Sequence, residues 1–244
     1  MLADEVLRRL GKYDTPTICN VLELFDIRPR DTGYTDARIR ACFPTLPPMV
    51  GYAATVTFRA SRAPAGQTEY VGLAEQVARL AELPRPAVVV FQDLDQPSVA
   101  ATFGEVMCAT YKAFGAAGLV TSGTGRDLEQ VEALRFPCFT AGTVASHGYC
   151  RFEAVDVPVE VGGLPIRPGD LLHGDRNGIT SIPVELAEAV ADACPEFAAA
   201  EAFVLDYLKL GRPTAVGYAE ARRACQEAIA RLASKCRTRV SRVS

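Results

Sequence analysis

The chain has 244 residues, 49% of them hydrophobic, and a formal net charge of -3 at pH 7. It is long enough to bury a substantial core as one large or two small domains, which argues against a disordered chain. Nucleic acids and anionic membranes are bound by clustered Lys and Arg, and the overall charge offers no such excess. We therefore expect neither a nucleic acid nor a membrane as a partner.

The eight cysteines are scattered along the chain, and no two form a Cys-x-x-Cys pair or a zinc-finger spacing. The first residues, MLADEVLRRLGKYD, are charged throughout and lack the apolar core of a signal peptide. No apolar run approaches the roughly 20 residues that span a bilayer. Thiols without an export signal are typical of a reducing compartment, so we expect a cytoplasmic protein.

The first half of the chain alternates between helical and extended patterns. Helical spacing begins near Glu5, and Asp14 or Thr15 can cap a helix that has Pro16 at a first helical position. A Pro- and Arg-rich connection follows. Then come an alternating β-branched strand, an amphipathic helix and a short buried strand, over residues 51–60, 70–83 and 87–93.

The second half adds a helix, a strand, another helix, a group of short strands and two closing helices. They cover residues 103–114, 118–122, 127 onward, 157–183, 184–193 and 195–210. Gly162 and Gly163 lie between alternating runs and indicate a hairpin, and Gly211 is a helix stop. One α/β domain, with βα units in the middle and antiparallel strands added later, is the simplest account.

The segment TSGTGRDLEQ, residues 121–130, follows one of these strands. It lacks the Gly-Lys-Ser/Thr of a phosphate loop and the third glycine of a dinucleotide-binding fingerprint. One interpretation is structural: Asp127 caps the next helix, Gln130 completes a capping box, and Arg126 is a solvated turn residue.

A second interpretation is functional and depends on the preceding helix, which opens at Gly104 and Glu105. If both strand-to-helix turns lie at one sheet edge, Glu105 and the next two backbone amides face the same crevice as Arg126 and Asp127. Helix amides and a guanidinium would hold a small carboxylate, and Asp127 is a hard oxygen ligand for Mg²⁺ or Mn²⁺.

Several stretches together resemble the class II pyruvate aldolases, a family typified by 4-hydroxy-4-methyl-2-oxoglutarate aldolase that includes the regulator of ribonuclease E activity A. The resemblance rests on GEVM with the Arg-Asp pair a fixed distance later, and on FPCFTAG. It also rests on VPVEVGGLPIRPGDLLHGDRNGITSIP and on the N-terminal YDTPTICNVLE. These pieces cover most of residues 13–211.

The resemblance implies a fold and an assembly. The fold would be a single swivelling-type β/β/α domain whose central mixed sheet is flanked by helices, with additional C-terminal helices. Residues 1–211 would form this domain and residues 212–244 a basic helical extension. Relatives form homotrimers or homohexamers in which a C-terminal glutamate enters the neighbour's site, and Glu201 is the best match for that residue.

The resemblance also assigns roles to the residues of the crevice. Arg126 would bind the pyruvate carboxylate, Asp127 would coordinate Mg²⁺ or Mn²⁺, and Glu105 would act through water. Gly104 and the amides of Val106 and Met107 would complete the carboxylate pocket.

These groups predict a divalent-metal-dependent lyase that acts on a pyruvate-derived 2-oxo acid. The metal can serve as an electron sink when the C3–C4 bond breaks, so aldol cleavage and oxaloacetate decarboxylation share one pyruvate enolate. Glu105 or Glu201 would move protons through water. The alternative is a non-catalytic regulator that binds a protein such as a ribonuclease. His147 and His173 have no acidic partner at metal spacing, and polar turn roles are favoured for both, with a place lining the cleft as the alternative for His173.

Overall fold

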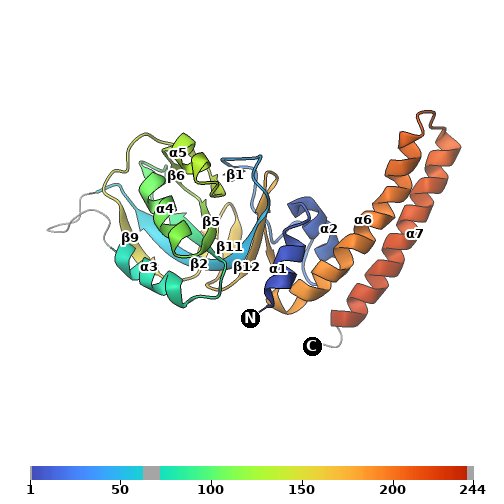
Figure 1. The fold of residues 1–244 in the computed structure, drawn as a ribbon, viewed down its shortest axis with the longest axis horizontal. Coiled ribbons are helices and arrows are strands. Elements are labelled where there is room, and N and C mark those ends of the chain that lie inside the picture. Colours follow the sequence, from blue (N-terminus) through green and yellow to red (C-terminus); the bar gives the residue numbers. More distant parts are fainter. Residues whose placement is uncertain (1, 63–71, 241–244) are drawn as a thin grey trace. The chain divides into compact units, whose positions relative to one another are not determined.

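The computed structural model describes residues 2–62 and 72–240, which form two compact units. The first unit covers residues 31–182 and holds all the described strands, and the second covers residues 2–30 and 183–240. The fold is α/β, with a central mixed sheet flanked by helices and with further helices at the C-terminus (Figure 1). That architecture confirms the predicted fold class. The expected division into a 1–211 domain and a 212–244 extension stays a prediction.

The central sheet is built around four parallel strands. In order across the sheet these are β7 (Cys138–Thr140), β5 (Ala116–Thr121), β3 (Ala87–Asp93) and β2 (Met49–Arg59). Antiparallel strands extend both edges: β1 (Arg40–Ala41) beside β7, then β12 (Leu171–Asp175) and β13 (Gly178–Ile182) beyond β2. Strand β9 (Arg151–Val155) pairs with the second half of β2.

Successive residues of a strand point to opposite faces, so β3 is buried on both sides. Val89 and Phe91 pack with the three helices α3 (Leu73–Glu82), α4 (Glu105–Ala113) and α5 (Leu128–Ala133). Val88 and Val90 pack on the other face, against the hairpin of β10 (Val159–Val161) and β11 (Leu164–Ile166). Figure 1 shows α3, α4 and α5 along one face of the sheet. The hairpin predicted at Gly162 and Gly163 is confirmed.

A second, smaller sheet extends the parallel strands. After β3, β5 and β7 the chain forms β4 (Ala101–Phe103), β6 (Thr124–Gly125) and β8 (Gly142–Thr143), which pair in parallel in that order. Helix α4 starts directly after β4, and α5 starts three residues after β6. This small sheet therefore fixes the starts of the two helices side by side.

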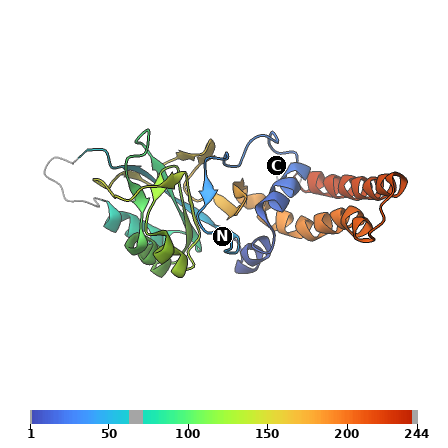
Figure 2. The same ribbon diagram turned by 90° about the horizontal axis from the view of Figure 1, so that it is seen from above.

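The second unit is helical and includes α1 (Asp4–Leu10), α2 (Thr15–Leu24), α6 (Ala187–Lys209) and α7 (Ala215–Val240). Figure 2 shows α6 and α7 running alongside each other as a hairpin. Of the two predicted cap residues, Asp14 caps α2, by accepting a hydrogen bond of 2.9 Å from the Thr17 amide, and Thr15 is the first residue of the helix. The C-terminal hairpin carries opposite charges on its two helices, with Lys235 paired to Glu196 and Arg239 to Asp192.

The prediction of two separate helices at residues 184–193 and 195–210 is wrong. After one short 3-10 turn (Val184–Leu186), α6 runs through Pro195 without a break. Proline removes one backbone hydrogen bond and crowds the preceding turn. Here the apolar face of α6, including Cys194 and Phe197, is buried among the other helices of the unit, and this packing outweighs the loss.

Candidate functional site

The candidate site lies where the small sheet ends and two helices begin. Strands β4 and β6 are paired with Phe103 opposite Gly125, and the Arg126 amide donates a 3.1 Å hydrogen bond to the Phe103 carbonyl. Gly125 permits this approach, since a side chain there would run into the Phe103 ring. The turn into α4 and the turn into α5 are therefore neighbours, although they are 22 residues apart in the chain.

The Asp127 side chain joins the two turns. Its Oδ2 accepts a 3.1 Å hydrogen bond from the Glu105 amide and lies 3.8 Å from Arg126 Nε. Asp127 has a φ of 55°, and no side-chain hydrogen bond caps α5. In this left-handed conformation, which Asp tolerates better than most residues, the carboxylate serves α4 and not its own helix. The capping-box interpretation of Asp127 and Gln130 is therefore wrong.

The side chains of Asp127 and Arg126 lie directly against Gly104. A Cβ on Gly104 would lie 2.6 Å from Asp127 Oδ2 and 3.2 Å from Arg126 Nε. The first contact is closer than van der Waals radii allow, so any side chain at this position would displace the carboxylate. Glycine is required here by close approach, because its φ of -153° is accessible to any residue.

The N-terminus of α4 supplies hydrogen-bond donors to the same place. The first amides of an α-helix have no acceptor within the helix, and their dipoles favour an anion. The Glu105 amide is taken by Asp127, which leaves those of Val106 and Met107 in the first turn. No side chain caps this helix at Gly104. The arrangement can hold a small carboxylate between two amides and a guanidinium.

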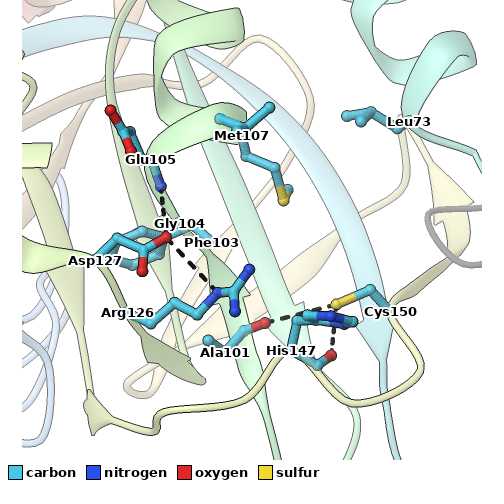
Figure 3. A pocket seen from close by; sticks show the side chains of 11 residues that line it. Leu73, Ala101, Phe103, Gly104, Glu105, Met107, Arg126, Asp127, His147 and Cys150 are labelled. Carbon is cyan, nitrogen blue, oxygen red and sulfur yellow. Dashed lines mark hydrogen bonds and ion pairs between the residues drawn. The ribbon is translucent and has the colours of Figure 1, made fainter. Parts of the chain in front are cut away.

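These residues line a pocket of about 310 Å³, which we call the Arg126 pocket (Figure 3). Figure 3 shows Arg126 and Asp127 on one side and Met107 and Leu73 on the other. Its lining consists of Leu73, Ala101, Phe103, Gly104, Glu105, Val106, Met107, Arg126, Asp127, His147 and Cys150. Six of the seven residues predicted for the site therefore meet in one cavity. The seventh, Glu201, is on α6 in the other unit.

His147 also lines the pocket, although its position in the sequence indicated only a turn residue. Its Nδ1 lies 2.8 Å from the Gly148 carbonyl, and a carbonyl can only accept. Nδ1 therefore carries the proton in the neutral ring, and Nε2 is the acceptor atom. His147 follows β8, the third strand of the small sheet. Only the pairing of β8 with β6 could have indicated that His147 lies at the pocket. His173, the other histidine, lies fully buried in β12, so its predicted turn role is wrong.

Another carboxyl residue, Asp93, is buried at the end of β3 outside the pocket lining. One of its oxygens accepts a hydrogen bond from the Asp95 amide. Burial raises the pKa of Asp93 above its ordinary value. Because the folded-state pKa exceeds the unfolded value of about 3.9, ionisation of this group lowers the stability of the fold as the pH rises through that range.

The pocket offers few ligands to a metal ion, so it suits a cation that takes most of its ligands from water and substrate. Within the described residues, no three His, Cys, Asp or Glu side chains gather where they could hold a metal ion. Asp127 would thus be a single hard oxygen ligand, held in place by the Glu105 amide and by its close approach to Gly104, which we call the Gly104 cradle. Mg²⁺ is commonly bound in this way, through one or two carboxylates, several waters and substrate oxygens. The residues present therefore fit Mg²⁺ or Mn²⁺.

The cradle leads to a prediction for Gly104→Ala. The added Cβ must push Asp127 and Arg126 aside, so we expect the lyase activity predicted from the sequence to fall by roughly 100-fold, the effect of an ångström-scale misplacement. The displaced atoms are ends of flexible side chains, so the melting temperature should change little. Gly142→Ala is the matched control, because its Cβ meets nothing closer than 3.8 Å. Equal activity of the two variants would show that the cradle has no functional role.

The comparison with known families decides what kind of protein this is. Residues 15–180 match the family model described as RraA-like, Aldolase/RraA. The chain belongs to the RraA-like family. The matched range includes every residue that lines the Arg126 pocket, whereas Glu201 and helix α7 lie beyond it.

Two individual relatives of this RraA-like protein match part of the chain. A Halalkalibacterium halodurans protein named "Putative 4-hydroxy-4-methyl-2-oxoglutarate aldolase" is 38% identical over 99 residues, 40% of this chain and 47% of that protein. An uncharacterized protein of Methanocaldococcus jannaschii is 33% identical over 95 residues, 38% of this chain and 46% of that protein. Both matches therefore span less than half of each relative.

Two solved structures share the fold over a larger part of the chain. An uncharacterized Pseudomonas syringae protein superposes with a TM-score of 0.71 at 24% identity, covering 91% of this chain and 94% of that one. RraAS2 of Streptomyces coelicolor, described as an unusual member of the RNase ES inhibitor RraA protein family, superposes with a TM-score of 0.65 at 26% identity, covering 83% and 96%. No helix in the described ranges is both long and apolar enough to cross a membrane.

Proposed function

We propose that this RraA-like protein is a divalent-metal-dependent carbon–carbon lyase that releases pyruvate from a 2-oxo acid. The observation that carries the proposal is the meeting of Arg126, Asp127 and the α4 amides around Gly104. The family membership and the relative named as an aldolase support it. A side chain at Gly104 would have blocked the same place.

The substrate carboxylate is held by Arg126 and by the amides of Val106 and Met107. Arg126 Nε faces Asp127 Oδ2, which leaves the two terminal nitrogens of the guanidinium for a bidentate grip. Its side chain is 30% exposed, so it is sheltered yet reachable from solvent. The grip fixes the keto carbon and the neighbouring methylene with respect to the acidic groups of the pocket.

Asp127 would hold the cation, which when bound supplies an electron sink for the negative charge that develops on the keto oxygen. In aldol cleavage the C4 hydroxyl loses its proton, the C3–C4 bond breaks, and its electron pair moves to C3, which then takes up a proton to give pyruvate. Glu105 is the first residue of α4 and belongs to the pocket lining, so its carboxylate can carry these protons through water. No lysine is among the residues that line the pocket, so no Schiff base is invoked.

Glu201 is proposed as a second proton carrier that acts from a neighbouring copy of the chain in a homotrimer or homohexamer. It is half-buried on α6, and the unit that contains it is distinct from the one that contains the pocket. In a cyclic assembly each interface joins two different surfaces, so a residue of one unit can complete the site of the next subunit.

The proposal is tested by pyruvate release from oxaloacetate with Mg²⁺, with and without EDTA. We expect turnover that depends on Mg²⁺, is abolished by EDTA and returns when Mg²⁺ is added in excess. Oxaloacetate also loses CO₂ slowly in free Mg²⁺, so the same buffer without protein is the blank. Turnover that persists in EDTA would contradict the metal requirement. No turnover above the blank, with oxaloacetate and with 4-hydroxy-2-oxo acids, would contradict the lyase.

The second candidate is a non-catalytic regulator that binds a ribonuclease. The likeness to RraAS2, described as belonging to an RNase ES inhibitor family, favours it. A regulator of this kind has no need for Asp127 and Arg126 around an open glycine cradle. The oxaloacetate assay separates the two candidates, because a pure regulator releases no pyruvate.

A further inference from the structure

We infer that the outer half of the α6–α7 hairpin is a two-fold interface through which two copies of this chain associate. This outer half, residues 202–231, we call the hairpin tip (Figure 2). It lies outside residues 15–180, which match the family model, and none of its residues lines the Arg126 pocket. The inference therefore goes beyond the proposed function and does not depend on it.

The hairpin tip is rich in apolar residues but has no buried residue. At the other end of the hairpin, Cys194 and Phe197 of α6 and Leu232 and Cys236 of α7 are buried. From residue 202 to residue 231, by contrast, every side chain is at least partly exposed. Helices in proteins owe most of their stability to the packing of an apolar face. The packing of α6 on α7 alone leaves the apolar face of the tip in water, which indicates that a further surface covers it.

The apolar residues of the tip gather on α6 and on the turn that follows it. Six of the eleven large hydrophobic residues that are exposed in the described structure lie in this short stretch: Phe203, Leu205, Leu208, Leu210, Val216 and Tyr218. The exposed residues further along α7 are polar apart from Ala230: Glu220, Arg222, Arg223, Gln226, Glu227 and Arg231. A contiguous apolar patch bordered by polar residues marks an interaction site. The patch is therefore on the α6 side of the tip.

An ion pair within this patch indicates that the partner is a second copy of the chain. Lys209 Nζ lies 2.8 Å from Asp206 Oδ1, and the two side chains are 76% and 67% exposed. Such an exposed pair contributes little to stability within one helix. When two α6 helices cross antiparallel with the two-fold axis between these residues, Asp206 of each copy faces Lys209 of the other. The patch is thus complementary to itself in charge, as a two-fold interface requires.

The apolar residues fit the same two-fold axis. Leu205 and Leu210 lie at equal distances in sequence from the point between Asp206 and Lys209, so Leu205 of each copy lies beside Leu210 of the other. This contact removes both leucines from water, where 55% and 77% of their surfaces are exposed in the single chain. A two-fold contact doubles any ring that other surfaces of the chain form, so a homotrimer would become a homohexamer.

The first test is the mass of Leu205→Glu, measured by light scattering after size exclusion. We expect the parent protein to contain an even number of chains and Leu205→Glu to contain half as many, because the new carboxylate lies in the apolar contact. Glutamate forms helices about as well as leucine, so circular dichroism should show an unchanged helix content. Gln226→Glu is the matched control, because it adds one negative charge on the polar side of α7 and should leave the mass unchanged.

The second test uses two charge variants of the ion pair. Asp206→Lys gives a patch with two lysines and Lys209→Asp a patch with two aspartates, so each variant alone should associate at least about tenfold more weakly than the parent protein. In an equal mixture the two variants should pair with each other at least about tenfold more tightly than either pairs with itself, because every aspartate then meets a lysine. Analytical ultracentrifugation measures these affinities. Mixing does not restore the ion pair within one chain, so recovery reports on the contact between copies.

The outcomes decide the inference without reference to enzyme activity. An odd number of chains in the parent protein, or equal masses for Leu205→Glu and the parent, would mean that the patch serves another partner, and would overturn it. Charge variants that fail to pair when mixed would also overturn it. Both tests read only mass and affinity, so an absence of pyruvate release would contradict the lyase and leave this interface standing.

Discussion

Asp127→Asn is expected to lower the specificity constant for Mg²⁺-dependent pyruvate release by more than about 100-fold, with the fold unchanged. Changing residues that only support a metal ligand costs about 10–100-fold, and Asp127 is the proposed ligand itself. Asn tolerates the left-handed backbone of residue 127 and can still accept the hydrogen bond from the Glu105 amide. The substitution therefore removes the negative charge and little else.

The measurement is the rate of pyruvate release from oxaloacetate over a series of Mg²⁺ concentrations, together with the melting temperature. Glu129→Gln is the matched control, because it removes one negative charge two residues further along, in the first turn of α5, at an exposed position outside the pocket. Near-normal activity of Asp127→Asn at limiting Mg²⁺ would show that this carboxylate only organises the turn.

Arg126→Lys is expected to lose about 100-fold or more in specificity constant although it conserves the charge. Lysine has one ammonium on a flexible chain and cannot make the planar, two-point contact with a carboxylate. In the structure the Nε of Arg126 faces Asp127, and the two terminal nitrogens remain for the substrate carboxylate. A single ammonium group cannot make both contacts. A substrate held at one point loses its alignment with the acidic groups.

The expected change should appear in both kcat and KM for oxaloacetate, and the affinity for pyruvate should fall with them. Arg135→Lys, at an exposed position outside the pocket lining, is the matched control. Comparable kinetics for Arg126→Lys and the parent protein would exclude a bidentate role for Arg126 and would leave the amides of α4 to hold the carboxylate alone.

Local patterns in the sequence were sufficient for most of the fold. The buried strands over residues 51–60 and 87–93, the Gly162-Gly163 hairpin and the cap at Asp14 are confirmed, because each depends on neighbours within a few residues. The predicted amphipathic helix at 70–83 is observed as α3 from Leu73, and its first residues, 70 and 71, lie outside the described ranges. The proximity of Glu105 to Arg126 and Asp127 follows from the pairing of parallel strands, a rule that needs only the order of the elements.

Long-range packing decided the rest. The sequence places Asp127 at the start of a helix and thus suggests a cap, but the neighbouring turn supplies the Glu105 amide and draws the carboxylate across. Pro195 suggests a break, but burial of one face of α6 keeps the helix continuous. His147 looks like a turn residue until the small sheet brings the end of β8 to the pocket. The sequence by itself therefore indicated the family, most of the elements and the acidic and basic groups of the candidate site. Only the tertiary structure decided which atoms face one another, because those contacts join residues more than 20 positions apart.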